Sequence, residues 1–234
     1  MNQTKLLAFA VICFSLNASD RSIYSSIQVD QAKFKSQTIT GTFDADPVPI
    51  RWANQYQADD KVGLGICFGF TPWKSTPSEF DVELGYRINT ESALRFLSQP
   101  DLGRYSLEYY SIGGVIRFKN ALGLGIGLDF RRETLGVLPY TPKTGWIPAS
   151  ATQIVTIYRP WAMISLTHDF FSGESVQPFV AARVGVALTK YDAPEGSDSS
   201  TPPPTDQYIS AWTRKFARSL APTFQIAIQS GIRF

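Results

Sequence analysis

Residues 61–70 read Lys-Val-Gly-Leu-Gly-Ile-Cys-Phe-Gly-Phe, and their strict alternation decides the fold. Every second residue, from Val62 to Phe70, is large and apolar, whereas the residues between them are lysine, glycine or cysteine. Successive side chains of a β-strand point to opposite faces of a sheet. The pattern therefore predicts a strand with one apolar face and one face of small residues.

The same period of two recurs along the chain. Eight segments share it: residues 23–34, 61–70, 79–88, 105–118, 122–131, 154–170, 180–188 and 224–234. Three of them are less regular: residues 23–34, 105–118 and 154–170. The second predicts a bulge near Tyr109 and the third a change of face around Arg159-Pro160. Eight is an even number, as antiparallel closure of a sheet requires. We expect an all-β fold, an eight-stranded antiparallel up-and-down barrel.

The connections between these segments alternate strictly between short and long. The short ones are residues 71–78, 119–121 and 171–177, and the long ones are residues 35–60, 89–104, 132–153 and 192–220. In an up-and-down barrel this alternation places every short turn at one end and every long loop at the other. No internal domain boundary is visible, so residues 19–234 are expected to form one barrel domain.

Residues 1–18 have the three-part layout of a secretory signal peptide. Lys5 gives a mildly positive start, an apolar stretch follows up to Leu16, and Asn17-Ala18 supplies small residues before the cleavage point. A buried N-terminal helix is the alternative interpretation. After cleavage Cys67 is the one remaining cysteine, so no intramolecular disulfide is expected.

The composition narrows the classes of function. A net charge of +2 without a basic tract gives no reason to expect a nucleic-acid partner. A mean hydropathy of −0.08 argues against a helical membrane protein. One histidine and two cysteines leave little material for metal sites or acid–base pairs. We therefore expect no cofactor, no metal site and no catalytic residues.

The alternation leaves open which face of the barrel is inside. A soluble barrel with the apolar face inward is one solution. The interior of an eight-stranded barrel is only just wide enough to be filled by side chains, and about five large residues from every strand would overfill it. Glycine on a solvated exterior would also weaken the strands. We expect the opposite arrangement, in which lipid covers the apolar face.

The aromatic residues support a membrane-spanning barrel, because they fall at the two ends of the expected strands as two interfacial girdles. One group lies at the short-turn ends: Phe68, Phe70, Phe80, Phe118, Phe170 and Phe234. The other lies toward the long loops: Tyr86, Phe130 and Phe224.

The last strand carries the most specific motif. Residues 225–234 read Gln-Ile-Ala-Ile-Gln-Ser-Gly-Ile-Arg-Phe, and the alternation ending in Ile232 and Phe234 resembles the signal read by the barrel-assembly machinery. The chain as a whole resembles the small outer-membrane barrels of the OmpA/OmpX type, including opacity and Ail-like proteins. The resemblance implies a monomer in the bacterial outer membrane, in contact with lipid and lipopolysaccharide, with extracellular long loops.

The small-residue face also carries charges of both signs, which closure would turn inward. The expected lumen cluster comprises Glu79, Asp81, Glu83, Arg87, Arg117, Asp129, Arg131, Asp169, Arg183 and Arg233. A salt-bridged plug is the favoured interpretation, because unpaired charges in a narrow lumen are costly. A narrow ion path is the alternative. Charges assigned to loops, such as Glu133, are expected to be solvated.

The long loops are the expected seat of any specific function, because a rigid scaffold presents them outside the cell. They carry aromatic residues that are candidates for binding a host or surface ligand: Trp52, Tyr56, Phe96, Tyr140, Trp146, Tyr208 and Trp212. The alternative is that these aromatic residues pack against one another. His168-Asp169 is the one fragment that resembles part of a catalytic site, and no nucleophile motif accompanies it.

We therefore expect a non-enzymatic outer-membrane barrel with a structural or surface-interaction role. A narrow pore, or an OmpW-like conduit for small or apolar solutes, is the second reading. An outer-membrane lipid-modifying enzyme is the third.

Overall fold

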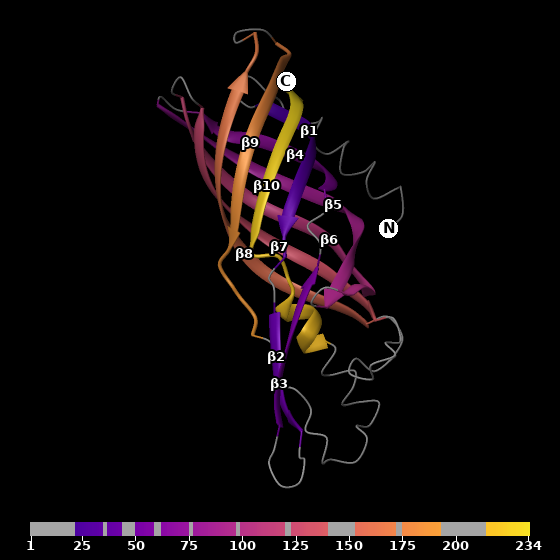
Figure 1. Ribbon diagram of the computed structural model, residues 1–234. Coiled ribbons are helices and arrows are strands. Elements are labelled where there is room, and N and C mark those ends of the chain that lie inside the picture. The colour runs from indigo at the N-terminus through magenta and orange to yellow at the C-terminus, as the bar shows by residue number, and fades with distance from the viewer. Residues whose placement is uncertain are drawn as a thin grey trace.

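Eight strands of the chain close into an antiparallel barrel, as the computed structural model shows (Figure 1). The structure describes residues 22–34, 37–43, 50–58, 62–74, 77–96, 99–119, 123–139, 153–171, 175–192 and 214–234. The barrel strands are β1 (Ser22–Lys33), β4 (Val62–Lys74), β5 (Ser78–Phe96), β6 (Gln99–Phe118), β7 (Leu124–Pro139), β8 (Gln153–Asp169), β9 (Gln177–Ala187) and β10 (Phe224–Arg233). β1 pairs with both β4 and β10, which closes the sheet and confirms the predicted fold class.

The pairing register sets the tilt of the strands. Starting from His168 on β8, we step from each residue to its partner on the next strand around the barrel. The path returns to β8 at Tyr158, an offset of ten residues. With a strand spacing of about 4.8 Å and a rise of about 3.3 Å per residue, this offset tilts the strands by about 40°. Each residue then advances about 2.5 Å along the barrel axis. The ten residues of β10 therefore span about 25 Å, the height of the apolar band of an outer-membrane barrel.

Four strands, β5 to β8, continue well past the barrel at its long-loop end. β5 has 19 residues and β6 has 20, and they stay paired up to Phe96 and Gln99. The predicted loop at residues 89–104 is therefore wrong, because most of it is strand. β7 likewise runs to Pro139, into the predicted loop at residues 132–153. Each extension forms because its neighbour continues beside it and satisfies the backbone hydrogen bonds.

The predicted loop at residues 35–60 is also largely strand. It contains a hairpin of β2 (Gln37–Phe43) and β3 (Ile50–Ala58), which lies outside the barrel wall (Figure 1). β3 pairs with the extension of β5 through Tyr56 and Phe96. The hairpin therefore adds two strands to the sheet beyond the barrel end.

Both predicted changes of face are absent. Odd-numbered side chains of β6 point inward from Tyr105 to Arg117, so the bulge is not in β6 at Tyr109. The extra residue lies in the facing part of β5, between Arg87 and Thr90. In β8 the odd positions also stay inside on both sides of Arg159. The sequence pattern is ambiguous in both strands because their inward positions near the long loops are apolar.

Those apolar positions form a core at the long-loop end of the barrel. A helical turn at residues 214–219 lies there, within the predicted loop at residues 192–220 (Figure 1). Phe216 and Leu220 are fully buried against inward side chains of β6, β7 and β8, such as Leu135. The Tyr105 hydroxyl donates a hydrogen bond to the Ala217 carbonyl at 3.2 Å. This helical turn therefore caps the barrel.

Candidate functional site

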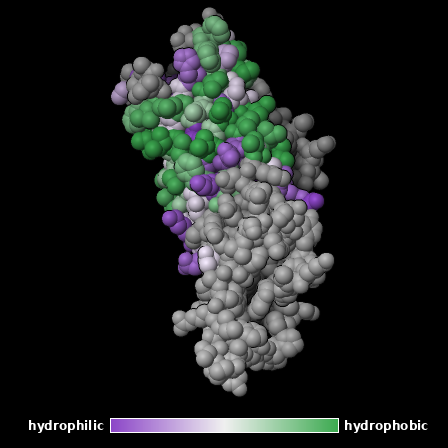
Figure 2. All heavy atoms as spheres, viewed as in Figure 1, coloured by the Kyte–Doolittle hydropathy of each residue, from purple (hydrophilic) through white to green (hydrophobic). Residues whose placement is uncertain are grey.

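The outer face of the barrel is apolar all the way around. Hydrophobic residues gather over the barrel wall in Figure 2, with hydrophilic residues at the borders of this band. Large exposed apolar side chains come from all eight barrel strands, among them Ile27, Leu64, Ile88, Ile112, Ile126, Ile164, Val184 and Ile228. A soluble monomer rarely exposes so large a continuous apolar surface. The band is the surface that a lipid bilayer covers.

The band ends at aromatic and charged side chains on the long-loop side. Tyr86 stacks on Tyr110 with ring centroids 4.8 Å apart, and Phe130 stacks on Tyr158. The next outward position of β7 after Phe130 is Arg132, which is exposed. Aromatic rings backed by charge mark a membrane–water interface.

The structure places all ten residues of the expected lumen cluster inside the barrel, where they form layers. The layer nearest the short turns is centred on Arg117. Its Nη2 atom lies 2.5 Å from Glu79 Oε2 and 3.4 Å from Asp81 Oδ2. Its Nη1 atom lies 3.3 Å from Asp169 Oδ2. One arginine thus contacts three carboxylates drawn from β5 and β8.

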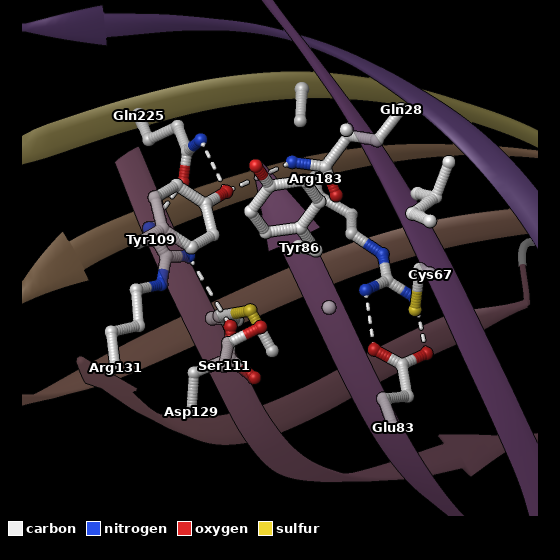
Figure 3. A pocket seen from close by; sticks show the side chains of 16 residues that line it. Gln28, Cys67, Glu83, Tyr86, Tyr109, Ser111, Asp129, Arg131, Arg183 and Gln225 are labelled. Atoms are coloured by element: carbon white, nitrogen blue, oxygen red, sulfur yellow. Dashed lines mark hydrogen bonds and ion pairs between the residues drawn. The ribbon is translucent and has the colours of Figure 1, made fainter. Parts of the chain in front are cut away.

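The second layer is centred on Glu83. Arg183 donates to it through both Nη atoms, each at 2.5 Å, in the two-pronged geometry that suits guanidinium and carboxylate (Figure 3). The Tyr24 hydroxyl also donates to Glu83. Residues of β1, β5 and β9 are therefore tied together across the lumen.

The third layer surrounds Arg131. Its Nη2 atom lies 3.2 Å from Asp129 Oδ2, and its Nη1 atom donates to Gln225 Oε1 at 2.5 Å. Its guanidinium also lies over the rings of Tyr109 and Trp161. A cavity of about 30 Å³ lies between this layer and Glu83 (Figure 3). A space of that size holds one or two water molecules.

Two further buried ion pairs lie toward the long loops. Arg87 Nε lies 2.9 Å from Asp30 Oδ1, and Arg87 also donates to the Leu107 carbonyl. Arg159 pairs with Glu133, and each side chain is 1% exposed. The prediction that Glu133 is a solvated loop charge is therefore wrong. β7 continues past its predicted end, so Glu133 points inward like Asp129 two steps away on the same face.

The short-turn end of the lumen opens into a wider space. This cavity of about 530 Å³, which we call the vestibule, is lined by Lys74, Glu79, Arg117, Phe118, Lys119, Gly123, Thr167, His168, Asp169, Gln177 and Arg233. The two ends of the barrel thus differ in kind. An apolar cap covers one end, and a charged hollow opens at the other.

The remaining predicted residues lie elsewhere. Ile232 and Phe234, the expected assembly signal, are both exposed on the outer face of β10. Three of the loop aromatics fall on strands beyond the barrel: Trp52 and Tyr56 on β3, and Phe96 at the end of β5. The other four lie outside the described residues: Tyr140, Trp146, Tyr208 and Trp212. Residues 1–21, with the predicted signal peptide, lie outside them too.

His168 is exposed on the outer face of β8 and packs edge-on against Phe170, with ring centroids 4.7 Å apart. Across the described part of the chain, no three His, Cys, Asp or Glu side chains gather as a metal site. The same residues contain no helix that is long and apolar enough to cross a membrane.

Sequence reasoning missed several residues of the lumen. Asp30 and Arg159 each complete an ion pair, and Tyr24 and Gln225 complete the hydrogen-bonded layers. For Arg159 a signal existed, because it shares the odd face of β8 with Ser165. For Asp30 the signal was that it alternates with Gln28 and Ala32 on one face of β1, which placed it on the inward face.

Comparisons with known proteins find no matching family model and no significantly similar curated protein. Several solved structures match over most of the chain. Ail, the attachment invasion locus protein of Yersinia pestis, has 10% identity and a TM-score of 0.42, over 91% of this chain and 98% of that one. The outer membrane protein OprG of Pseudomonas aeruginosa has 9% identity and a TM-score of 0.45, over 91% of each chain. Neisserial surface protein A has 7% identity and a TM-score of 0.38, over 90% of this chain and 95% of that one.

Because these scores are low, the assignment of the molecule rests on its own surface and pairing. A closed barrel leaves no unpaired edge inside a bilayer, the outer face is apolar over about 25 Å, and the inner face is charged. The chain is a transmembrane β-barrel of the kind found in bacterial outer membranes.

Proposed function

We propose that this outer-membrane barrel is a non-enzymatic scaffold with a closed lumen, and that it holds a platform for surface interaction outside the cell. The observation that carries the proposal is the contrast between its two halves. The half inside the membrane is filled by paired charges, whereas the strands continue beyond the membrane as an extended sheet.

The closed lumen supports a structural role for the membrane half. The largest fully buried side chains include Trp161, Arg87, Arg159 and Tyr24, all of which point into the barrel. Each arginine of the lumen has at least one carboxylate partner within 4 Å. Such pairs are costly to break, so they hold the wall rigid instead of lining an open path.

The strand lengths support the platform. At about 2.5 Å per residue along the axis, the 20 residues of β6 cover about 50 Å, twice the apolar band. The outward residues Arg104, Ser106 and Glu108 in its first half are polar, in place of the isoleucines near the short turns. The long-loop extensions of β5 and β6 therefore stand outside the bilayer, and the β2–β3 hairpin widens the sheet that these extensions form.

The closed lumen is tested by single-channel recording of the full chain in planar bilayers. We expect no steady openings from wild type, because the ion-pair layers fill the cross-section. Steady openings that disappear when lumen residues are substituted would overturn the plug and favour a pore or a solute conduit.

The platform is tested by displaying the full chain on a non-adherent Gram-negative strain and counting bacteria attached to epithelial cells. The matched variant replaces residues 37–58, the hairpin, with a short turn and leaves the barrel strands intact. We expect attachment with wild type and its loss with this variant. Equal attachment by wild type, variant and empty strain would refute the surface role.

The non-enzymatic part of the proposal has its own test. The mass spectrum of lipid A is compared between cells with and without expression of the chain. We expect identical spectra, because His168 faces outward without a nucleophile motif beside it. A new lipid A species would identify a lipid-modifying enzyme.

A further inference from the structure

Arg233 stands apart from the other lumen arginines because it lacks a close partner. Its side chain is 9% exposed. Its Nη atoms lie 3.7 Å from Glu79 Oε2 and 3.9 Å from Asp169 Oδ1, distances that are too long for hydrogen bonds. Among the described residues, no acceptor bonds its buried Nε atom. The Nε atoms of Arg117, Arg131 and Arg183 are also unbonded, so the long contacts of its Nη atoms are what distinguish Arg233. Buried polar groups in native proteins are nearly always bonded, so these Nη atoms are suited to take a further acceptor.

The guanidinium is nevertheless held firmly in place. It lies over the ring of Tyr24 at 5.2 Å and over the ring of Phe179 at 5.5 Å. These two rings themselves meet edge-on. Arg233 is thus fixed in the wall of the vestibule, which its side chain lines.

The vestibule has room for a ligand and carries excess positive charge. Its volume is about 530 Å³. Four cations line it, namely Lys74, Arg117, Lys119 and Arg233, against the carboxylates of Glu79 and Asp169. Arg117 contacts Glu79 Oε2 at 2.5 Å and Asp169 Oδ2 at 3.3 Å, and Lys119 Nζ adds a contact to Glu79 Oε1 at 3.1 Å. Asp169 Oδ1 has no hydrogen-bond partner among the described residues and lies 3.9 Å from Arg233 Nη2. Asp81, which does not line the vestibule, also contacts Arg117 Nη2 at 3.4 Å and offsets part of its charge.

We propose that the vestibule binds a phosphate-type oxyanion, with Arg233 as the inner donor and Lys119 as the donor at the rim. A tetrahedral oxyanion supplies several acceptors at once, and the guanidinium fork matches two of them. Lys119 is 43% exposed and carries its charge on a flexible stem, so it can turn toward the ligand. Water filling the vestibule would satisfy the donors but would not balance the charge.

Two sources of this oxyanion fit the position of the vestibule. It opens at the short-turn end, which faces the periplasm in an outer-membrane barrel. Phe118 and His168, which face outward, also line it, so its rim reaches the lipid-facing surface. The ligand is therefore either free phosphate from the periplasm or the phosphate of a phospholipid headgroup in the inner leaflet.

The test is calorimetric titration of inorganic phosphate into the full chain, refolded in maltoside micelles that contain no phosphate. We expect saturable binding with a Kd of about 1 mM or tighter at low ionic strength, weakening as salt is added. Absence of saturable binding to wild type would overturn the proposal.

Four variants locate the site, each first checked for folding by the heat-dependent shift of its gel band. Arg233→Gln is expected to weaken phosphate binding at least about tenfold and Lys119→Gln several-fold. Glu79→Gln is expected to tighten it, because this substitution removes a competing carboxylate. Lys215→Gln is the control, an exposed cation at the opposite end of the barrel. If Arg233→Gln folds and binds phosphate like wild type, the assignment of the site is wrong. If Arg233→Gln does not fold, the phosphate affinities of Lys119→Gln and Glu79→Gln test the assignment instead.

The source is identified by repeating the wild-type titration in phosphatidylglycerol nanodiscs. A headgroup that occupies the vestibule would compete, so the apparent phosphate affinity would fall below that in micelles. An unchanged affinity would identify free phosphate as the ligand. Both outcomes retain the oxyanion site, and neither depends on what the extracellular platform binds.

Discussion

Removing the charge of Glu133 tests whether the lumen is a dry plug or a wet path. Glu133 accepts hydrogen bonds from Arg159 Nε at 3.1 Å and from Arg159 Nη2, and Trp161 Nε1 donates to it at 2.8 Å. Both members of the ion pair are 1% exposed. Glu133→Gln would leave the Arg159 guanidinium buried with only weaker acceptors, such as the Thr189 carbonyl at 3.4 Å.

The expected cost follows from that burial. Breaking a buried ion pair by removing one partner destabilises a protein by about 3–5 kcal/mol, because a buried charge is left uncompensated. The double substitution Glu133→Gln with Arg159→Met should recover most of this loss, since replacing both charges is close to neutral. The assay is urea unfolding of the barrel refolded in phospholipid vesicles, followed by tryptophan fluorescence.

A matched control lies on the same chain. Arg104 and Glu91 form an ion pair of 2.9 Å between side chains that are 56% and 55% exposed. Glu91→Gln should cost less than about 1 kcal/mol, because water screens the exposed pair. If Glu133→Gln costs no more than Glu91→Gln, water reaches Arg159 and the reasoning for a closed lumen fails.

Three further substitutions test other parts of the barrel. Ile126→Arg, in the middle of the lipid-facing band where the isoleucine is 55% exposed, should cost about 2–4 kcal/mol, measured by the same urea unfolding. Gly63→Ala should cost about 1–3 kcal/mol in that assay, because a Cβ there would collide with the Arg87 guanidinium and push it from Asp30. Phe216→Ala should loosen the cap and speed proteolysis near residue 216, yet give no steady conductance in planar bilayers, because the ion-pair layers beneath the cap remain.

The sequence predicted the outward face of the barrel better than its interior. Outward residues within the bilayer are predominantly apolar, so the period of two is regular in β4, and in β10 apart from Ser230, and it fixes the faces of both strands. Inward residues obey no such rule. In β6 they change from Arg117 through Gly113 to Tyr109 and Leu107, and the apolar ones resemble a lipid-facing set. A strand without a bulge cannot change face, so extending the phase from Arg117 would have placed Tyr109 inside.

Which lumen charges pair with each other could not be predicted from the sequence, for a different reason. Arg183 and Glu83 lie on β9 and β5, which are not neighbours in the sheet, so their contact depends on the tilt of the strands as well as on the faces they occupy. Tilt follows from the offset of ten residues around the barrel, and no local pattern reveals that offset. The β2–β3 hairpin was missed because its strands form on the extension of β5, which was itself expected to be loop.

The distribution of charge along the lumen explains why one end is capped and the other is open. The deeper arginines, Arg87, Arg131, Arg159 and Arg183, each have a carboxylate oxygen within 3.2 Å. The opposite charges of such close pairs nearly cancel, so the pairs need no mobile counter-ions. An apolar cap can therefore cover them without burying an uncompensated charge. Arg233 has no contact as short, and it lies at the end where solvent and ions have access. The one loosely paired guanidinium of the lumen therefore sits where an external anion can reach it, which is the arrangement that a binding site requires and a structural plug does not.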